Sequence, residues 1–105
     1  MNAILLDMQA TVWHNMGETA RSATWSASSF PCHWEQRRGS YRTASGELEA
    51  WALEMICNKA GIEKGDKLSF GISSSKTPPQ DAFTVVWVDT LPLRGKIHHY
   101  EVYAK

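Results

Sequence analysis

The chain has 105 residues, and its 11 lysines and arginines balance its 11 aspartates and glutamates, so the formal net charge is zero. A chain of this length forms one domain, and we expect a single domain over residues 1–105. The neutral balance argues against a protein whose main role is to coat nucleic acid or an anionic membrane. The absence of a long apolar run argues against a membrane-spanning helix.

The first two elements are expected to be strands. Apolar side chains alternate with others over residues 3–13, which is the period of a half-buried strand. Residues 19–30 alternate again and are interpreted as the return strand of a hairpin, with a serine-rich linker as the alternative. Pro31 ends this element. Residues 31–44 hold either a short strand near 40–42 or a well-packed loop.

The next segment, residues 46–60, predicts the main helix. At helical spacing its apolar side chains cover two sides rather than one. One side carries Leu48, Trp51, Ala52, Met55 and Ile56, and the other carries Ala50, Leu53, Cys57 and Ala60. Ser45 is a suitable N-cap, and Gly61 stands where a left-handed residue ends a helix.

Three further strands are expected after this helix, at 68–73, 82–89 and 97–104. The strand at 82–89 is apolar on both faces, which is typical of a central strand. Short connections between these strands favour an antiparallel meander. The sequence therefore predicts an α+β fold with one main helix packed on a mostly antiparallel sheet of about five strands. The expected order is strand, strand, helix, strand, strand, strand.

The two apolar sides of the predicted helix indicate association. A single sheet covers one side only, so the side with Leu53 and Cys57 needs another layer. A symmetric homodimer through this side is the simplest source of that layer. The leading hypothesis is accordingly a non-enzymatic binding or protein-interaction module. Disulfide-dependent domains of this size usually carry more than two cysteines, so we expect a reduced, cytoplasmic protein, and we expect no cofactor.

One cluster of positive charge precedes the predicted helix. Residues 36–42 carry three arginines and no acid, and two aromatic residues accompany them. The candidate binding residues are Trp34, Arg37, Arg38, Tyr41 and Arg42. Arginines beside aromatic rings suit single-stranded nucleic acid or an acidic protein partner. A solvated loop whose arginines balance Glu35 and Glu47 is the alternative. A single-stranded nucleic-acid binder is therefore the second functional hypothesis.

Histidines and cysteines give weaker candidates. Cys32 with His33, and His98 with His99, are adjacent pairs, and adjacent residues on a strand point to opposite faces. Such pairs do not match the spacing of a zinc site, and no nucleophile signature surrounds Cys32. His99 and Glu101 share one face of the last predicted strand, an arrangement that tunes general bases. The third hypothesis is thus a small enzyme or ligand-binding protein with a pocket near His98 or His99, with no metal site and no catalytic residue assigned.

Overall fold

The structure, a computed structural model, describes residues 6–18, 23–93 and 96–105, without the side chains at 18, 23 and 91–98. None of the described residues lies in a helix, so this part of the chain contains no helix that is able to cross a membrane. The eight strands are β1 (Met8–Glu18), β2 (Ala23–Glu35), β3 (Gly39–Arg42), β4 (Leu48–Trp51), β5 (Leu53–Cys57), β6 (Lys67–Phe70), β7 (Phe83–Leu93) and β8 (Lys96–Ala104).

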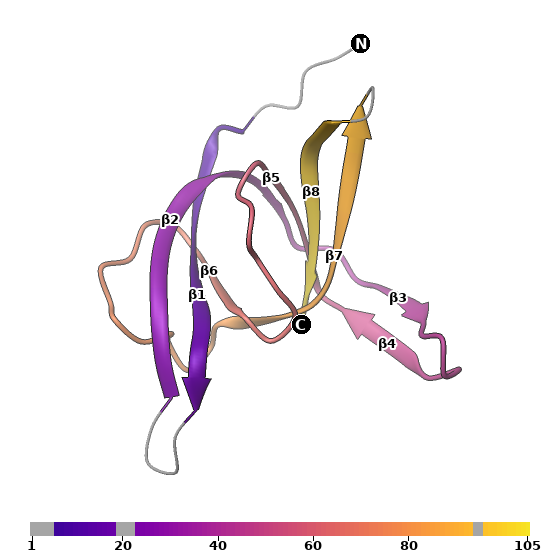
Figure 1. The fold of residues 1–105 in the computed structure, drawn as a ribbon, viewed down its shortest axis with the longest axis horizontal. Coiled ribbons are helices and arrows are strands. Elements are labelled where there is room, and N and C mark those ends of the chain that lie inside the picture. The colour runs from indigo at the N-terminus through magenta and orange to yellow at the C-terminus, as the bar shows by residue number, and fades with distance from the viewer. Residues whose placement is uncertain (1–5, 19–22, 94–95) are drawn as a thin grey trace.

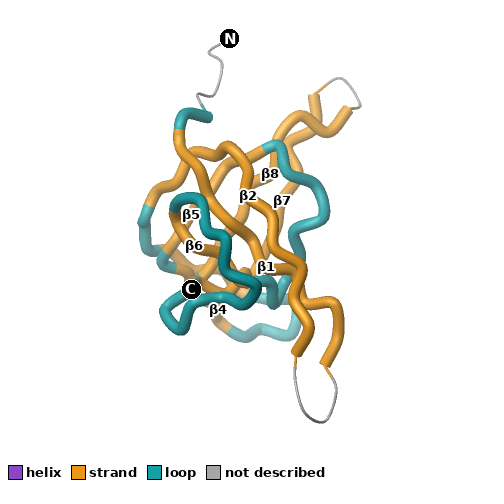
Figure 2. Tube along the Cα trace, turned by 90° about the vertical axis from the view of Figure 1, so that its left-hand side faces the viewer, coloured by secondary structure: helices purple, strands orange, loops and turns teal. Residues whose placement is uncertain are grey.

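Six strands close into a barrel in the order β1-β2-β5-β8-β7-β6, and β3 and β4 form a separate two-stranded sheet (Figure 1). Every pairing is antiparallel. Closure leaves the barrel without a free sheet edge. Figure 2 shows the β1–β2 and β7–β8 hairpins extending past the barrel in opposite directions.

One end of the barrel brings together the starts of β1, β5 and β7 and the ends of β2, β6 and β8. The register shows this directly, because Glu35 pairs with Glu54 and Ala104 pairs with both Leu53 and Val85. The β3–β4 hairpin is inserted between the end of β2 and the start of β5, so it leaves the barrel here. We call this the hairpin end of the barrel.

The barrel interior is filled by alternate residues of the strands. On β5 the side chains of Leu53, Met55 and Cys57 are buried, whereas Glu54 and Ile56 between them are partly exposed. This period of two is what a sheet with one buried face requires. The buried core consists of Ala10, Val12, Phe30, Cys32, Leu53, Met55, Cys57, Ile62, Leu68, Val85, Val102 and Ala104.

The outer face of β1 is covered by the segment that follows β6. The Thr11 hydroxyl donates to the Gly71 carbonyl at 2.8 Å, and the Ser73 amide donates to the Thr11 hydroxyl oxygen at 3.0 Å. The Trp13 indole nitrogen donates to the Ser75 carbonyl at 3.0 Å. These bonds satisfy the polar groups of two buried residues.

Asp66 fixes the turn that enters β6. Its carboxylate is buried and accepts bonds from the Glu63 amide at 2.8 Å and the Asn15 amide at 3.4 Å. His14 Nδ1 lies 3.0 Å from both carboxylate oxygens. The hydrogen bond and the negative charge of Asp66 raise the pKa of His14 above its usual 6.5. One buried carboxylate therefore ties β1 to the β5–β6 connection.

The expected main helix at residues 46–60 is absent, and the α+β prediction is wrong. This segment forms β4 and β5, so the order is strands throughout. Residues 53–57 alternate at period two, but their apolar residues also fit a helix with two apolar sides, and local periodicity does not separate a strand from a buried helix here. Residues 53–57 form a strand because they pair with β2 on one side and β8 on the other. Ser45 lies in a hairpin turn instead of capping a helix, whereas Gly61 does have the expected positive φ, 89°.

The strand predictions fared better. The first hairpin and strands over 68–70, 83–89 and 97–104 exist, but the strand predicted at 68–73 ends at Phe70. The first strand begins at Met8, and the return strand extends to Glu35. Residues 3–5 and 19–22 of the predicted strands lie outside the described residues. Leu53 and Cys57 are both fully buried within one chain. This pair therefore offers no surface to a second subunit, and a homodimer must be argued from another surface.

Candidate functional site

An open cleft lies at the hairpin end of the barrel, where four strand termini meet. Its volume is about 500 Å³. The lining residues are Met8, Trp34, Gln36, Ser69, Phe70, Asp81 and Phe83. Met8 begins β1, Phe70 ends β6 and Phe83 begins β7. Ligand sites of this size favour the mouths of barrels and combine apolar walls with a few polar groups, and this cleft has that composition.

The cleft is built around Trp34, which the sequence singled out. Its ring meets Phe70 edge-on, with ring centroids 5.5 Å apart, and meets Phe83 in the same way at 5.7 Å. Edge-to-face contacts of this kind are favourable for aromatic pairs. The Trp34 amide donates to the Met8 sulfur at 3.3 Å, which ties the end of β2 to the start of β1. Phe70 nevertheless remains 59% exposed.

Arg37 lies apart from the cleft and is paired with acids. Its guanidinium contacts Glu35 at 3.2 Å and Glu54 at 3.5 Å. Glu35 and Glu54 are directly opposite each other across β2 and β5, where two like charges repel. Arg37 thus neutralises a repulsive pair of the barrel surface.

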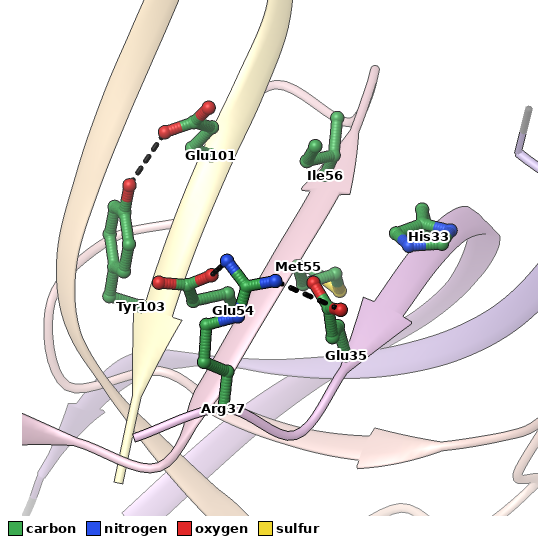
Figure 3. A pocket seen from close by; sticks show the side chains of 8 residues that line it. All are labelled: His33, Glu35, Arg37, Glu54, Met55, Ile56, Glu101 and Tyr103. Carbon is green, nitrogen blue, oxygen red and sulfur yellow. Dashed lines mark hydrogen bonds and ion pairs between the residues drawn. The ribbon is translucent and has the colours of Figure 1, made fainter. Parts of the chain in front are cut away.

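The same arginine lines a second, smaller hollow on the outer face of β2, β5 and β8, with a volume of about 280 Å³ (Figure 3). We call this the acidic hollow, and it is lined by His33, Glu35, Arg37, Glu54, Met55, Ile56, Glu101 and Tyr103. The Tyr103 hydroxyl donates to Glu101 at 2.6 Å. Burial and this carboxylate raise the pKa of Tyr103, so its hydroxyl stays protonated.

Tyr41 belongs to a third group of residues, four rings that we call the aromatic cluster. The cluster comprises Tyr41, Trp51, Trp87 and Tyr103. Tyr41 lies 4.8 Å from Trp87, and Trp51 lies 4.8 Å from Tyr103, between ring centroids. Two rings come from the β3–β4 hairpin and two from β7 and β8. The cluster therefore anchors the hairpin on the outside of the barrel.

Gly39 is required by this arrangement. It is the cross-strand partner of Trp51, and a Cβ at position 39 would overlap the Trp51 indole ring. The ring therefore lies directly on the glycine backbone, as aromatic residues do opposite glycine in sheets.

The two remaining candidate arginines are exposed. Arg42 on β3 donates to the Gly46 carbonyl at 2.7 Å and so closes the hairpin turn. Arg38 lies in the short connection between β2 and β3. The five candidate binding residues thus do not form one patch: Trp34 joins the cleft, Arg37 the acidic hollow, Tyr41 the aromatic cluster, and Arg38 and Arg42 the surface.

The histidine and cysteine candidates do not form a site: His33 lines the acidic hollow, and the others are buried or have side chains outside the described residues. His99 is buried, and its Nδ1 lies 2.6 Å from the Asn58 amide oxygen. The side chain of His98 is outside the described residues. Cys32 and Cys57 are buried cross-strand partners; burial raises the pKa of Cys32 to about 11 and also raises that of Cys57. Both thiols stay protonated and are poor nucleophiles.

No group of three or more His, Cys, Asp or Glu side chains suited to a metal ion occurs within the described ranges. Sequence reasoning assigned Phe70 and Phe83 to strand faces and missed their role in the cleft. Phe83 stands near the start of the strand predicted at 82–89, but Phe70 lies inside the one predicted at 68–73, so no local signal marked the two as a pair. Their meeting with Trp34 depends on closure of the barrel.

Comparison with known proteins gives no assignment: no family model matches the chain, and neither a curated protein nor a solved structure matches it.

Proposed function

We propose that this protein is a non-enzymatic interaction module that holds an apolar anchor side chain of a protein partner in the cleft. The observation that carries the proposal is the 59% exposure of Phe70 within a hollow that Trp34 and Phe83 also line. Leaving a ring of this size in water is unfavourable. Rings that cover one another at the bottom of a pocket and leave one face open are typical of the hot spots of protein interfaces.

The chemistry of the cleft supports binding over catalysis. Among its lining residues only Asp81 is ionisable, and Asp81 is exposed. Catalytic acids, bases and nucleophiles are commonly tuned by a neighbouring base or by a shifted pKa, and no second ionisable residue lines the cleft beside Asp81. The polar residues Gln36, Ser69 and Asp81 instead resemble the rim that orients an apolar anchor.

The single-stranded nucleic-acid hypothesis receives less support. Stacking surfaces for nucleic acid combine exposed rings with free cations along one groove. Here Arg37 is occupied by Glu35 and Glu54, and the acidic hollow contains a third carboxylate, Glu101. A phosphate backbone that followed this surface would meet net negative charge.

The proposal is tested by fluorinated phenylalanine, because the chain contains only three phenylalanines. Phe70 and Phe83 line the cleft, and Phe30 lies in the core. The protein, labelled with 4-fluorophenylalanine, is titrated with N-acetyl-phenylalanine amide and N-acetyl-leucine amide while its fluorine spectrum is recorded. The expected result is a saturable shift of the Phe70 and Phe83 resonances with Phe30 unchanged.

A matched pair of variants localises the effect. Phe70→Ser removes the exposed ring of the cleft, so the Phe83 resonance should no longer respond. Ile72→Ser removes an even more exposed apolar side chain that does not line the cleft, and the response should persist. The cleft would be excluded as a binding site by either of two results. In the first, neither amide shifts the Phe70 and Phe83 resonances; in the second, the Phe83 resonance still shifts in the Phe70→Ser protein.

A further inference from the structure

The β3–β4 hairpin has two different faces. Residues directly opposite in an antiparallel pair lie on the same face. Tyr41 and Trp51 lie on the inner face, against the barrel, and are partly buried. The outer face carries Ser40, Ala50, Arg42 and Leu48, all exposed. The hairpin, which projects from the side of the barrel in Figure 1, is therefore held by one face and presents the other to the solvent.

The outer face presents an apolar side chain next to a cation. Arg42 and Leu48 are cross-strand partners near the hairpin turn. Leu48 is 65% exposed, so the described residues leave most of its side chain uncovered. Arg42 uses one donor for the Gly46 carbonyl, while a guanidinium has five. The pair therefore retains both an apolar group and a charged group for an external contact.

The cleft has the complementary chemistry. Its apolar wall consists of Trp34, Phe70 and Phe83, and its one ionised lining group is the carboxylate of Asp81. The cleft lies at the hairpin end of the barrel, which is also where the β3–β4 hairpin leaves it. Within one chain the two do not meet, because Leu48 and Phe70 both remain exposed.

We infer that the partner held in the cleft is the β3–β4 hairpin of a second copy of this chain. Leu48 of one copy fills the space beside Phe70 of the other, and Arg42 pairs with Asp81. Because hairpin and cleft share one end of the barrel, two copies related by a two-fold axis exchange hairpins reciprocally and make the contact twice. The zero net charge removes long-range repulsion between copies. This inference rests on the proposed function and names its partner.

Three exposed residues allow a charge-exchange test by sedimentation velocity from low micromolar to near-millimolar concentration. The wild-type protein should show a concentration-dependent monomer–dimer equilibrium. Leu48→Asp, Arg42→Glu and Asp81→Lys should each raise the dimer dissociation constant by about tenfold or more, as loss of an interface anchor does. Met16→Asp changes an equally exposed apolar residue on the other hairpin and should leave the equilibrium unchanged.

Mixing distinguishes exchange between copies from any effect within one chain. Arg42→Glu and Asp81→Lys proteins should each be monomeric alone. An equimolar mixture of the two should dimerise, because every contact then joins opposite charges. Thermal unfolding of each variant checks that the fold is intact.

Three results would each overturn the inference. The wild-type protein could stay monomeric at every concentration, its dimer dissociation constant could be unchanged by Leu48→Asp, or the mixture of variants could stay monomeric. If the fluorinated cleft residues still respond to the apolar amides in that case, only the identity of the partner is wrong. If they do not respond, the proposed function fails as well.

Discussion

The aromatic cluster and the cleft are built from the same kinds of side chain, but only the cluster is covered by another part of the chain. In the cluster, Tyr41 and Trp51 of the hairpin lie on Trp87 and Tyr103 of the barrel. In the cleft, Trp34 contacts two rings from the barrel itself, and the described residues leave Phe70 59% exposed. The contacts assign the rings of the cluster to holding the hairpin on the barrel, whereas under the proposed function the exposed ring of Phe70 contacts a partner.

The largest effect is expected from removing a ring of the cluster. Trp51→Ala deletes contacts with Tyr41 and Tyr103 and a hydrogen bond from its indole to Glu54 at 3.2 Å. Large-to-small changes of this kind destabilise by about 2–4 kcal/mol. Urea denaturation gives the free energy of unfolding. A loss no greater than that of Phe70→Ala would remove the distinction between the two regions.

Adding a single methyl group below the same ring should have the next largest effect. Gly39→Ala places a Cβ against the Trp51 indole, and overpacking of this kind destabilises by about 1–3 kcal/mol. The penalty should shrink in a Gly39→Ala protein that also carries Trp51→Ala, because the clashing ring is gone. Additive losses in this double-mutant cycle would mean that the Trp51 ring does not lie on Gly39.

The cleft should tolerate the loss of its exposed ring. Phe70→Ala removes one edge-to-face contact with Trp34 but little buried surface, so the free energy of unfolding should fall by less than about 1 kcal/mol. Binding of the apolar amides should be lost at the same time. A large loss of stability would place Phe70 in the core and contradict its role as a recognition residue.

The smallest change in the free energy of unfolding is expected at His14, which lies outside both aromatic regions and serves as a reference. The raised pKa of His14 means that the folded state binds the proton more tightly, so its contact with Asp66 stabilises fully below the usual pKa of 6.5. This contribution is lost as the pH rises through the raised pKa. The difference in unfolding free energy between wild type and His14→Gln should therefore shrink with increasing pH. A difference in unfolding free energy that grows with increasing pH would contradict a raised pKa for His14.

Period-two alternation was enough to find most strands, because it reports a sheet with one buried face wherever a segment lies. It failed at residues 46–60, because their apolar residues also fit a helix with two apolar sides, one carrying Met55 and the other carrying Leu53 and Cys57. The choice there depends on pairing with β2 and β8, which are separated from it in sequence by tens of residues. No local pattern contains that information.

The candidate site was predictable only in part for the same reason. Trp34 was selected from its own neighbourhood and does line the cleft. The arginines beside it were expected on the same surface, but the turn after β2 sends Arg42 into the hairpin and leaves Arg37 against two glutamates. Phe70 and Phe83 join Trp34 only when the barrel closes.

The most direct test of an available cleft uses the methionine methyl groups as reporters. Met8 lines the cleft, whereas Met16 stands on the same strand, is 62% exposed and does not line it. In protein labelled at the methionine methyls, titration with N-acetyl-leucine amide should shift the Met8 resonance saturably and leave Met16 unchanged. If both resonances shift equally, or if only the Met16 resonance shifts, the amide contacts any exposed apolar side chain and the cleft is not a recognition site.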